Sequence, residues 1–244
     1  MQNMKKKQTI SIVIPAYNEQ NYIWDCLDSI MRYCVDFIDE VLVIDNASTD
    51  NTANIVKQYP MVRYIKENNK WLVRARQRGY IESTGDIIAY IDADTRVWKD
   101  WIHKVIKEFE TNKKLVFLSG AYDYYDMEKW KKIWLWLYRY MLAYPSYLVT
   151  WYLWIGGNMI MRRSMLDRIW WFDTDIEFYG EDTNIARRAY QIWKCKFMLD
   201  LMAYTSARRL KKQWIFNTIY IYITNFLSQS IIKKSIHNDY QDHR

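Results

Sequence analysis

Short apolar runs alternate along this chain with longer segments in which apolar residues recur every three or four positions. The short runs predict buried strands, and the spaced pattern predicts helices that bury one face. Strands are expected at residues 10–14, 40–44, 62–66, 87–91, 115–121, 159–161 and 197–204. Helices are expected at residues 21–33, 52–59, 72–83, 101–110 and 184–192, with a helical turn at 164–169. This alternation predicts an α/β fold with a mostly parallel, Rossmann-like sheet and helices on both faces.

The strand expected at residues 87–91 leads directly into two carboxylates, Asp92 and Asp94. Ligands of open α/β sheets bind at the carboxyl ends of the strands, where these side chains are expected. Two carboxylates this close repel each other unless a cation or a proton lies between them. Oxygen ligands suit Mg²⁺ or Mn²⁺ that also binds substrate phosphates. The simpler interpretation is a solvated turn that caps the next helix, and an isolated Asp-x-Asp would favour it.

Further polar segments stand at the ends of the expected elements. Two of them follow the first two strands, Pro15-Ala16-Tyr17-Asn18-Glu19 and Asp45-Asn46-Ala47-Ser48-Thr49-Asp50. Two others precede the strand at 159–161 and the helix at 184–192, namely Gly156-Gly157-Asn158 and Tyr179-Gly180-Glu181-Asp182. Each motif alone is weak evidence of a functional site, and Glu181-Asp182 out of context would be interpreted as an ordinary helix N-cap.

Together and in this order, the five motifs resemble the inverting nucleotide-sugar glycosyltransferases of family 2, which have the GT-A fold. The resemblance covers roughly residues 9–210. It implies a GT-A domain at residues 1–210, with a nucleotide-binding half at about 9–97 and an acceptor-side half at about 98–210. Residues 211–244 would add an amphipathic helix and a basic tail.

The resemblance implies roles for residues on the donor side. Those that would bind the nucleotide are Pro15, Tyr17, Glu19, Asp45, Asp92 and one or both of Arg74 and Arg76. Asp94, with Asp92 close by, would hold Mn²⁺ or Mg²⁺ on the diphosphate. The default donor of the family is a UDP-sugar.

The resemblance also implies the chemistry of transfer. Asp182 would be the base that deprotonates the acceptor hydroxyl, supported by Glu181, in a single displacement that inverts the anomeric centre. Arg208 and Arg209 would stabilise the charge on the diphosphate together with the metal. The acceptor or diphosphate side would also include Gly156, Gly157 and Asn158. No Gln-x-x-Arg-Trp motif of the processive members is found, which favours transfer of single sugars.

Residues 133–144 and 147–155 are apolar and densely aromatic, and residues 214–232 place apolar side chains on one helical face. Arg139 and Pro145 are expected to interrupt the aromatic region, so that no run of about 20 apolar residues could span a bilayer. Two interpretations carry equal weight. These are aromatic-rich amphipathic helices that contact a membrane surface and a saccharide or lipid-linked acceptor, or they are core helices that happen to use aromatics.

Composition and charge narrow the choice of partner and compartment. The formal charge of +7 suits phosphates, nucleic acid or anionic lipid as partners. No nucleic-acid-binding module is recognisable, and nucleic acid is not expected as a partner. Three isolated cysteines suit a reduced, cytoplasmic protein. The aromatic segments would add peripheral contact at the cytoplasmic face of a membrane. The apolar run at residues 10–14 stops at Pro15, which argues against a signal peptide. A sugar-phosphate nucleotidyltransferase would need a glycine-rich basic loop, which residues 15–20 lack.

Tryptophan stands at several positions where the family has a small residue or proline. These are Trp71 in an Asn-x-Gly loop beside the donor, Trp98, Trp170 and Trp171 before Phe-Asp, and Trp193 after a helix. Bulky residues at glycine positions introduce strain and fill pocket volume. The pattern is typical of an altered version of a natural sequence. It supports a second hypothesis, a catalytically impaired GT-A-fold protein that acts as a membrane-surface binding or scaffold protein.

Overall fold

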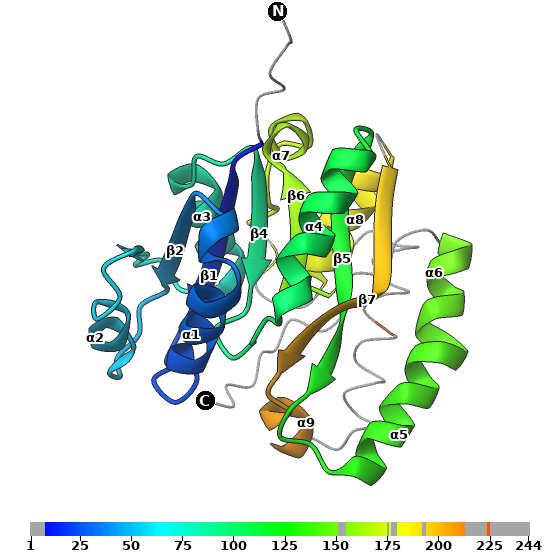
Figure 1. The fold of residues 1–244 in the computed structure, drawn as a ribbon, viewed down its shortest axis with the longest axis horizontal. Coiled ribbons are helices and arrows are strands. Elements are labelled where there is room, and N and C mark those ends of the chain that lie inside the picture. Colours follow the sequence, from blue (N-terminus) through cyan, green and yellow to red (C-terminus); the bar gives the residue numbers. More distant parts are fainter. Residues whose placement is uncertain are drawn as a thin grey trace, which may run out of the picture.

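The computed structural model describes residues 8–150, 155–174, 176, 180–191, 194–212 and 224. Seven strands form one sheet between two layers of helices (Figure 1). They are β1 (Ile10–Ala16), β2 (Glu40–Asp45), β3 (Val62–Lys66), β4 (Ile87–Ile91), β5 (Leu115–Tyr124), β6 (Asn158–Arg162) and β7 (Lys194–Thr205). Their order across the sheet is β3-β2-β1-β4-β6-β5-β7. The predicted α/β class and mostly parallel sheet are confirmed.

The direction of β6 decides which loops meet. β1 pairs in parallel with β2 and β4, β2 with β3, and β5 with β7, whereas β6 runs antiparallel to both of its neighbours. An antiparallel strand starts where its neighbour ends, and Asn158 at the start of β6 pairs with Ile91 at the end of β4. The Gly156-Gly157-Asn158 motif therefore lies beside the Asp-x-Asp motif.

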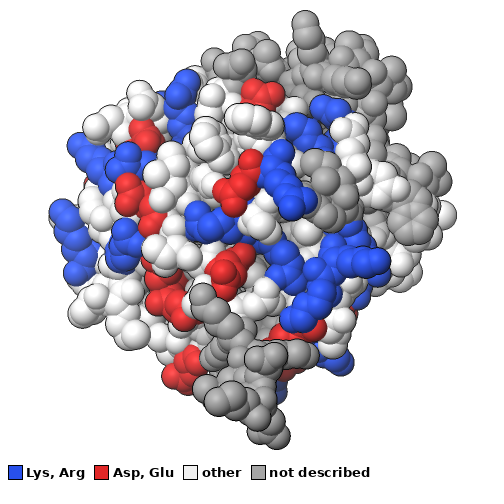
Figure 2. All heavy atoms as spheres, turned by 90° about the horizontal axis from the view of Figure 1, so that it is seen from above, with Lys and Arg blue, Asp and Glu red and all other residues white. Residues whose placement is uncertain are grey.

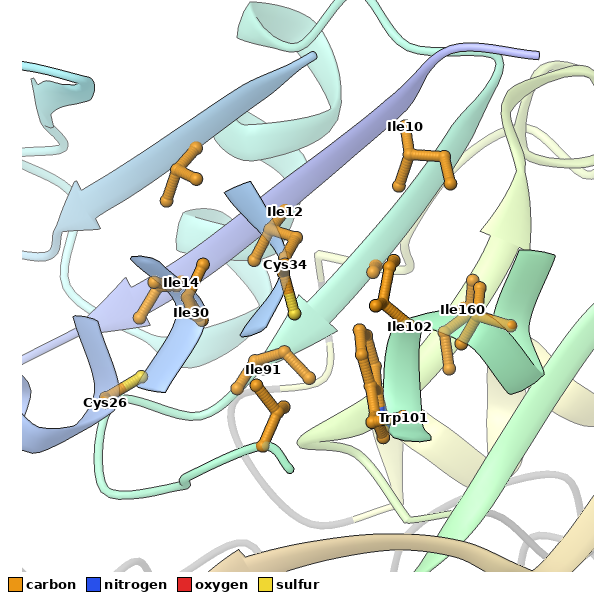
Figure 3. Close-up of a cluster of buried hydrophobic side chains, with 14 of the residues drawn as sticks. Ile10, Ile12, Ile14, Cys26, Ile30, Cys34, Ile91, Trp101, Ile102 and Ile160 are labelled. Carbon is orange, nitrogen blue, oxygen red and sulfur yellow. The ribbon is translucent and has the colours of Figure 1, made fainter. Parts of the chain in front are cut away.

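The helices bury apolar stripes on both faces of the sheet, as predicted. The helices α1 (Ile23–Tyr33) and α4 (Lys99–Thr111) cover the near face in Figure 1. The opposite face is covered by α3 (Leu72–Glu82), α7 (Arg163–Arg168) and α8 (Glu181–Tyr190). Because side chains alternate along a strand, Ile12 and Ile14 of β1 pack toward α1 while Val13 joins the cluster with α3. Figure 3 shows the first cluster, with Trp101 and Ile102 of α4 beside Ile160.

The aromatic region is helical. α5 (Lys129–Tyr138), a π-helical segment (Arg139–Ala143) and α6 (Tyr144–Thr150) follow one another directly, so Arg139 and Pro145 interrupt the apolar sequence, as predicted, without ending the helical run. Pro145 is the second residue of α6 and lies directly after the π-helical segment. Within the described segments, no helix is long and apolar enough to cross a membrane.

Several boundaries shift for local reasons. α2 (Thr52–Val56) is shorter than predicted, because the residue before Pro60 disfavours helical backbone. β5 extends to Tyr124, since its end pairs with Thr205 of β7. A short 3₁₀ turn (Val35–Phe37) and α9 (Arg208–Lys212) complete the described elements. The amphipathic helix predicted at 214–232 and the position of Trp193 lie outside the described residues.

Charge is mixed on the side of the molecule that Figure 2 shows, where basic and acidic side chains are interspersed. Arg63 forms an ion pair with Glu40 at 2.8 Å, and a second with Glu82 at 3.5 Å. The formal charge of +7 is thus not concentrated into a single-sign surface on this face.

Gly120 lets β5 approach β7 closely, and we expect Gly120→Ala to destabilise the fold. A Cβ at this position would collide with the backbone carbonyl of Leu201 and lie 2.5 Å from Nδ2 of Asn158. The expected loss is about 1–3 kcal/mol of unfolding free energy, as for overpacking of a core. Urea unfolding followed by circular dichroism measures it. An unchanged urea midpoint would show that β5 and β7 can move apart at this position without loss of unfolding free energy.

Candidate active site

The sequence-predicted residues gather at one edge of the sheet. β1, β2 and β4 end there, and β6 begins there. This edge brings together Asp45 at the end of β2, Asp92 after β4 and the loop before Asn158. Carboxyl ends of parallel strands are the usual ligand edge of open α/β sheets.

Asp92 contacts side chains from two other elements. Its Oδ2 accepts a hydrogen bond of 3.2 Å from the hydroxyl of Tyr122 in β5. Its Oδ1 lies 3.5 Å from the guanidinium of Arg76, which donates a long hydrogen bond to it. The side chain nevertheless keeps about a third of its surface exposed, so a ligand can reach it.

Arg76 is fully buried and joins the two halves of the site. One guanidinium nitrogen donates a 2.7 Å hydrogen bond to Oε1 of Glu181, while another faces Asp92. Burial alone would lower the pKa of Arg76, but the charges of these carboxylates raise it above its usual value. A Cβ at Gly156 would lie 2.8 Å from the guanidinium, so the glycine leaves room for it. Arg74 of the same helix is exposed, so Arg76 is the arginine that enters the site.

Glu181 and Asp182 open α8, directly after Gly180 with its left-handed backbone (φ 88°). Acidic groups in a first turn interact favourably with the helix dipole. Burial nevertheless raises the pKa of both carboxyls, and the charge of Asp182 raises the pKa of Glu181 further. The Arg76 guanidinium lowers both pKa values. The result is a carboxyl pair that is more basic than usual and can take up a proton.

A second arginine connects the N- and C-terminal parts of the described chain. Arg208 of α9 donates two hydrogen bonds to Glu19, of 2.7 and 2.6 Å, and lies 3.0 Å from Oδ2 of Asp94. The other oxygen of Asp94 accepts a 3.1 Å hydrogen bond from the hydroxyl of Thr205. Burial raises the pKa of Asp94, while the positive charges of Arg208 and Arg209 lower it. Both arginines predicted to act on the diphosphate therefore lie at the second aspartate.

At the predicted nucleotide-binding end of this edge, the side chain of Asp45 is already hydrogen-bonded within the protein. Asp45 is buried and accepts hydrogen bonds from the hydroxyl of Tyr64 (2.6 Å) and the backbone N–H of Ser48 (3.0 Å). Burial and this carboxylate raise the pKa of Tyr64 to about 12. Pro15 is buried in β1, and the ring of Tyr17 lies under the ammonium of Lys70 at 4.4 Å. In this structure Asp45 orders the loop after β2.

Three residues of the site were missed from the sequence. Tyr122 binds Asp92, Thr205 binds Asp94, and the Tyr125 hydroxyl donates to the backbone carbonyl of Asp94 at 3.2 Å. All three follow from the pairing of the ends of β5 and β7, which lie far from Asp94 in sequence. The only signal available was the cluster of tyrosines at the end of the strand predicted at 115–121.

The residues present fit a shared cation better than a protein cage. Among the described residues, no group of three or more His, Cys, Asp and Glu side chains could hold a metal ion. Asp92 and Asp94 supply two carboxylates, and Mg²⁺ typically binds through one or two carboxylates plus substrate phosphates. Arg208 already occupies one oxygen of Asp94.

The comparison with known families decides the assignment. The sequence model described as "Glycosyl transferase family 2" matches residues 11–170. The chain belongs to this family. It is accordingly a glycosyltransferase by family, as the sequence predicted.

This glycosyltransferase matches only part of the length of its curated relatives. EpsJ of Bacillus subtilis (strain 168), an uncharacterized glycosyltransferase, is 26% identical over 204 residues, which are 78% of this chain and 58% of EpsJ. The chain likewise spans less than two thirds of the first curated relatives that it matches.

Solved structures show the same fold. The mannosyltransferase PcManGT from Pyrobaculum calidifontis, in complex with GDP-Man and Mn²⁺, aligns with a TM-score of 0.71 at 19% identity, over 93% of this chain and 64% of that one. Glucosyl-3-phosphoglycerate synthase from Mycobacterium tuberculosis, in complex with Mn²⁺, UDP and phosphoglyceric acid, aligns with a TM-score of 0.67 at 18% identity, over 93% and 78% of the two chains. The predicted GT-A fold is confirmed.

Arg76→Met tests the buried charge network of this glycosyltransferase. Removing one partner of a buried ion pair costs about 3–5 kcal/mol of unfolding free energy. The folded-state pKa values of Glu181 and Asp182 already lie above their usual range, so stability falls as pH rises through that interval. Loss of the guanidinium raises both pKa values further. The destabilisation is therefore larger at about pH 8 than at about pH 5.

Chemical unfolding at the two pH values measures this difference. Arg74→Met removes the same charge from the exposed face of the same helix and is the matched control. The control is expected to change stability by no more than about 0.5 kcal/mol at either pH. Equal losses for the two variants would contradict a role for the buried guanidinium.

Proposed function

We propose that this protein transfers a sugar from a nucleotide-sugar donor, a UDP-sugar by the default of its family, to an acceptor hydroxyl with inversion. The observation that carries the proposal is the Asp92–Arg76–Glu181 contact. One guanidinium thus contacts Asp92 at the end of β4 and Glu181 at the start of α8, next to Asp182. Donor and base would thus be fixed relative to each other before either substrate binds, which is how positioning lowers a barrier.

The reaction needs one base and one place for negative charge. The acceptor oxygen attacks the anomeric carbon as the bond from that carbon to the diphosphate breaks, and the hydroxyl proton passes to the carboxylate of Asp182. One base suffices for a single displacement with inversion. The raised pKa of Asp182 suits it to accept that proton. Glu181 and Arg76 act as positioning residues, since they orient and tune the base.

Negative charge on the departing diphosphate calls for cations on the donor side. Asp92 and Asp94 would hold Mn²⁺ or Mg²⁺ together with the phosphates, and the metal would supply positive charge to the leaving group. Both similar structures named above were obtained with Mn²⁺. Arg208 and Arg209 would add fixed positive charge at Asp94. Glu19 would hold Arg208 in place through its two short hydrogen bonds.

The acceptor proposed is a saccharide or a lipid-linked saccharide at the cytoplasmic face of a membrane. Support comes from α5, which exposes the large apolar side chains of Trp130, Ile133, Trp134 and Trp136. Aromatic side chains beside Lys131 and Lys132 suit the membrane–water interface. A test is sedimentation with anionic vesicles, and loss of binding in a Trp134→Ala, Trp136→Ala double variant is the expected result.

Calorimetric titration of UDP with Mn²⁺, and then with EDTA, tests the donor site. Binding is expected to require the metal, and Asp94→Ala is expected to weaken it at least tenfold, which is about 1.4 kcal/mol. Asp200→Ala is the matched control, because Asp200 is exposed on β7, where it forms an ion pair with Lys104. Metal-independent binding that survives Asp94→Ala would remove the proposed role of the two aspartates.

Asp182→Asn separates catalysis from binding. Loss of a general base is expected to lower the transfer rate by about 10²–10⁴-fold. The affinity for UDP should stay within about twofold of the unsubstituted protein's, because Asp182 lies at the start of α8 and is not among the residues proposed to bind the donor. Rates with a panel of UDP-sugars and simple saccharide acceptors give the readout. Unimpaired transfer by a well-folded Asp182→Asn variant would assign the base elsewhere.

The second candidate is an impaired GT-A-fold protein that acts as a membrane-surface binding or scaffold protein. The observation favouring it is the left-handed backbone of Trp71 beside Asn46 at the donor edge. A folded protein that binds vesicles but neither UDP nor GDP would support this candidate over the transferase.

A further inference from the structure

Tryptophan occupies backbone conformations that it normally avoids. Among the described residues, five that are not glycine have a left-handed φ, namely Asn18, Ala47, Trp71, Trp170 and Trp171. Asparagine tolerates this region through its short polar side chain, and alanine carries only a Cβ. Three of the five are nevertheless the bulkiest residue type. A left-handed backbone at a bulky residue is strained, and glycine is the residue that adopts it freely.

Trp170 and Trp171 complete a helix end whose geometry calls for glycine. α7 ends at Arg168 with Ile169 as its C-cap, and the next two residues have φ of 58° and 65°. The backbone N–H of Trp171 donates to the carbonyl of Leu166 at 3.0 Å. This 6→1 hydrogen bond defines the Schellman motif, in which the residue after the C-cap is usually glycine in a left-handed conformation. Trp170 is that residue.

The side chain of Trp170 offers no compensation for the strain. It is 82% exposed, the largest exposed fraction among the large apolar side chains that the structure describes. The fold fixes the backbone here from both sides, because Arg188 donates to the carbonyls of Ile169 (2.7 Å) and Trp171 (2.8 Å). The conformation is thus set by the surroundings, and the indole gains nothing from it.

Trp71 shows the same conflict at the donor edge. Its φ of 123° and ψ of 139° lie in a region that is almost confined to glycine. Its backbone N–H donates to Oδ1 of Asn46 at 2.8 Å, and its carbonyl accepts from the N–H groups of Arg74 and Ala75. These bonds begin α3 and tie it to the loop after β2, so the backbone cannot relax without losing them.

Trp101 shows what an ordinary tryptophan position looks like in this fold. It lies in α4 with 2% of its surface exposed, and its indole N–H donates to Oδ1 of Asn158 at 3.0 Å. Composition repeats the contrast. The chain has 13 tryptophans and only 6 glycines, whereas average usage of about 7% predicts roughly 17 glycines in a chain of this length.

We propose that positions 71, 170 and 171 are glycine positions, and that the protein as its native cell makes it carries glycine there. A codon that different genetic codes read differently provides the route. UGA is a stop codon in the standard code, is read as tryptophan in some codes and is read as glycine in others. The chain with tryptophan at these positions is then a strained form of the native protein. This inference does not depend on the proposed function.

The folding test compares two substitutions at one exposed site, Trp170→Gly and Trp170→Ala. Both remove the indole, but only glycine also removes the Cβ that the left-handed backbone disfavours. Trp170→Gly is expected to melt about 2–4 °C above Trp170→Ala and above the unsubstituted chain. Trp101→Gly, at the buried helical position, is expected to lower the melting temperature strongly or to prevent folding. Melting of Trp170→Gly at or below Trp170→Ala would overturn the requirement for glycine.

The second measurement addresses the native protein directly. Peptide mass mapping of the protein isolated from its own host is expected to give glycine masses at positions 71, 170 and 171 and a tryptophan mass at position 101. Tryptophan masses at the first three positions would overturn the decoding, whatever the melting curves show. The same map identifies the residues at positions 130, 134 and 136 of α5.

Discussion

The fully buried guanidinium of Arg76 is the constraint on which the rest of the site depends. A buried cation without partners is prohibitively costly, so two carboxylates must reach it. Glu181 reaches it from the start of α8 and Asp92 from the end of β4. That requirement fixes the distance between the donor edge and the proposed base. Gly156 leaves room for the guanidinium, since a Cβ at this position would lie only 2.8 Å from it.

The antiparallel strand β6 makes this meeting possible. In a purely parallel sheet, the loop before Asn158 would lie at the opposite edge from Asp92. Reversal of one strand brings the two glycines beside the carboxylates, and Asn158 then links the layers by bonding to Trp101 of α4 and to the carbonyl of Leu201 in β7. One buried amide thus connects the core in Figure 3 to the site at the end of β4.

Local patterns predicted the strands and the carboxylates at their ends, because a buried strand and a polar loop each have a signature within a few residues. The pairings that give those carboxylates their properties could not be read locally. Arg76 and Glu181 are 105 residues apart, and Arg208 and Glu19 are 189 apart. The sequence accordingly left Arg74 and Arg76 undecided and missed Tyr122 and Thr205.

Two kinds of departure from ordinary local rules meet in this chain, and their surroundings distinguish them. Arg76 breaks the rule against buried charge, yet the carboxylates of Glu181 and Asp92 compensate its charge, as expected where function requires the exception. Trp170 breaks the rule for left-handed backbone and receives no compensation, since its side chain projects into solvent. The surrounding hydrogen bonds nevertheless hold its backbone in the form that a glycine would take. The residues around position 170 hold its backbone in a conformation that glycine adopts freely, and glycine at that position is the best explanation.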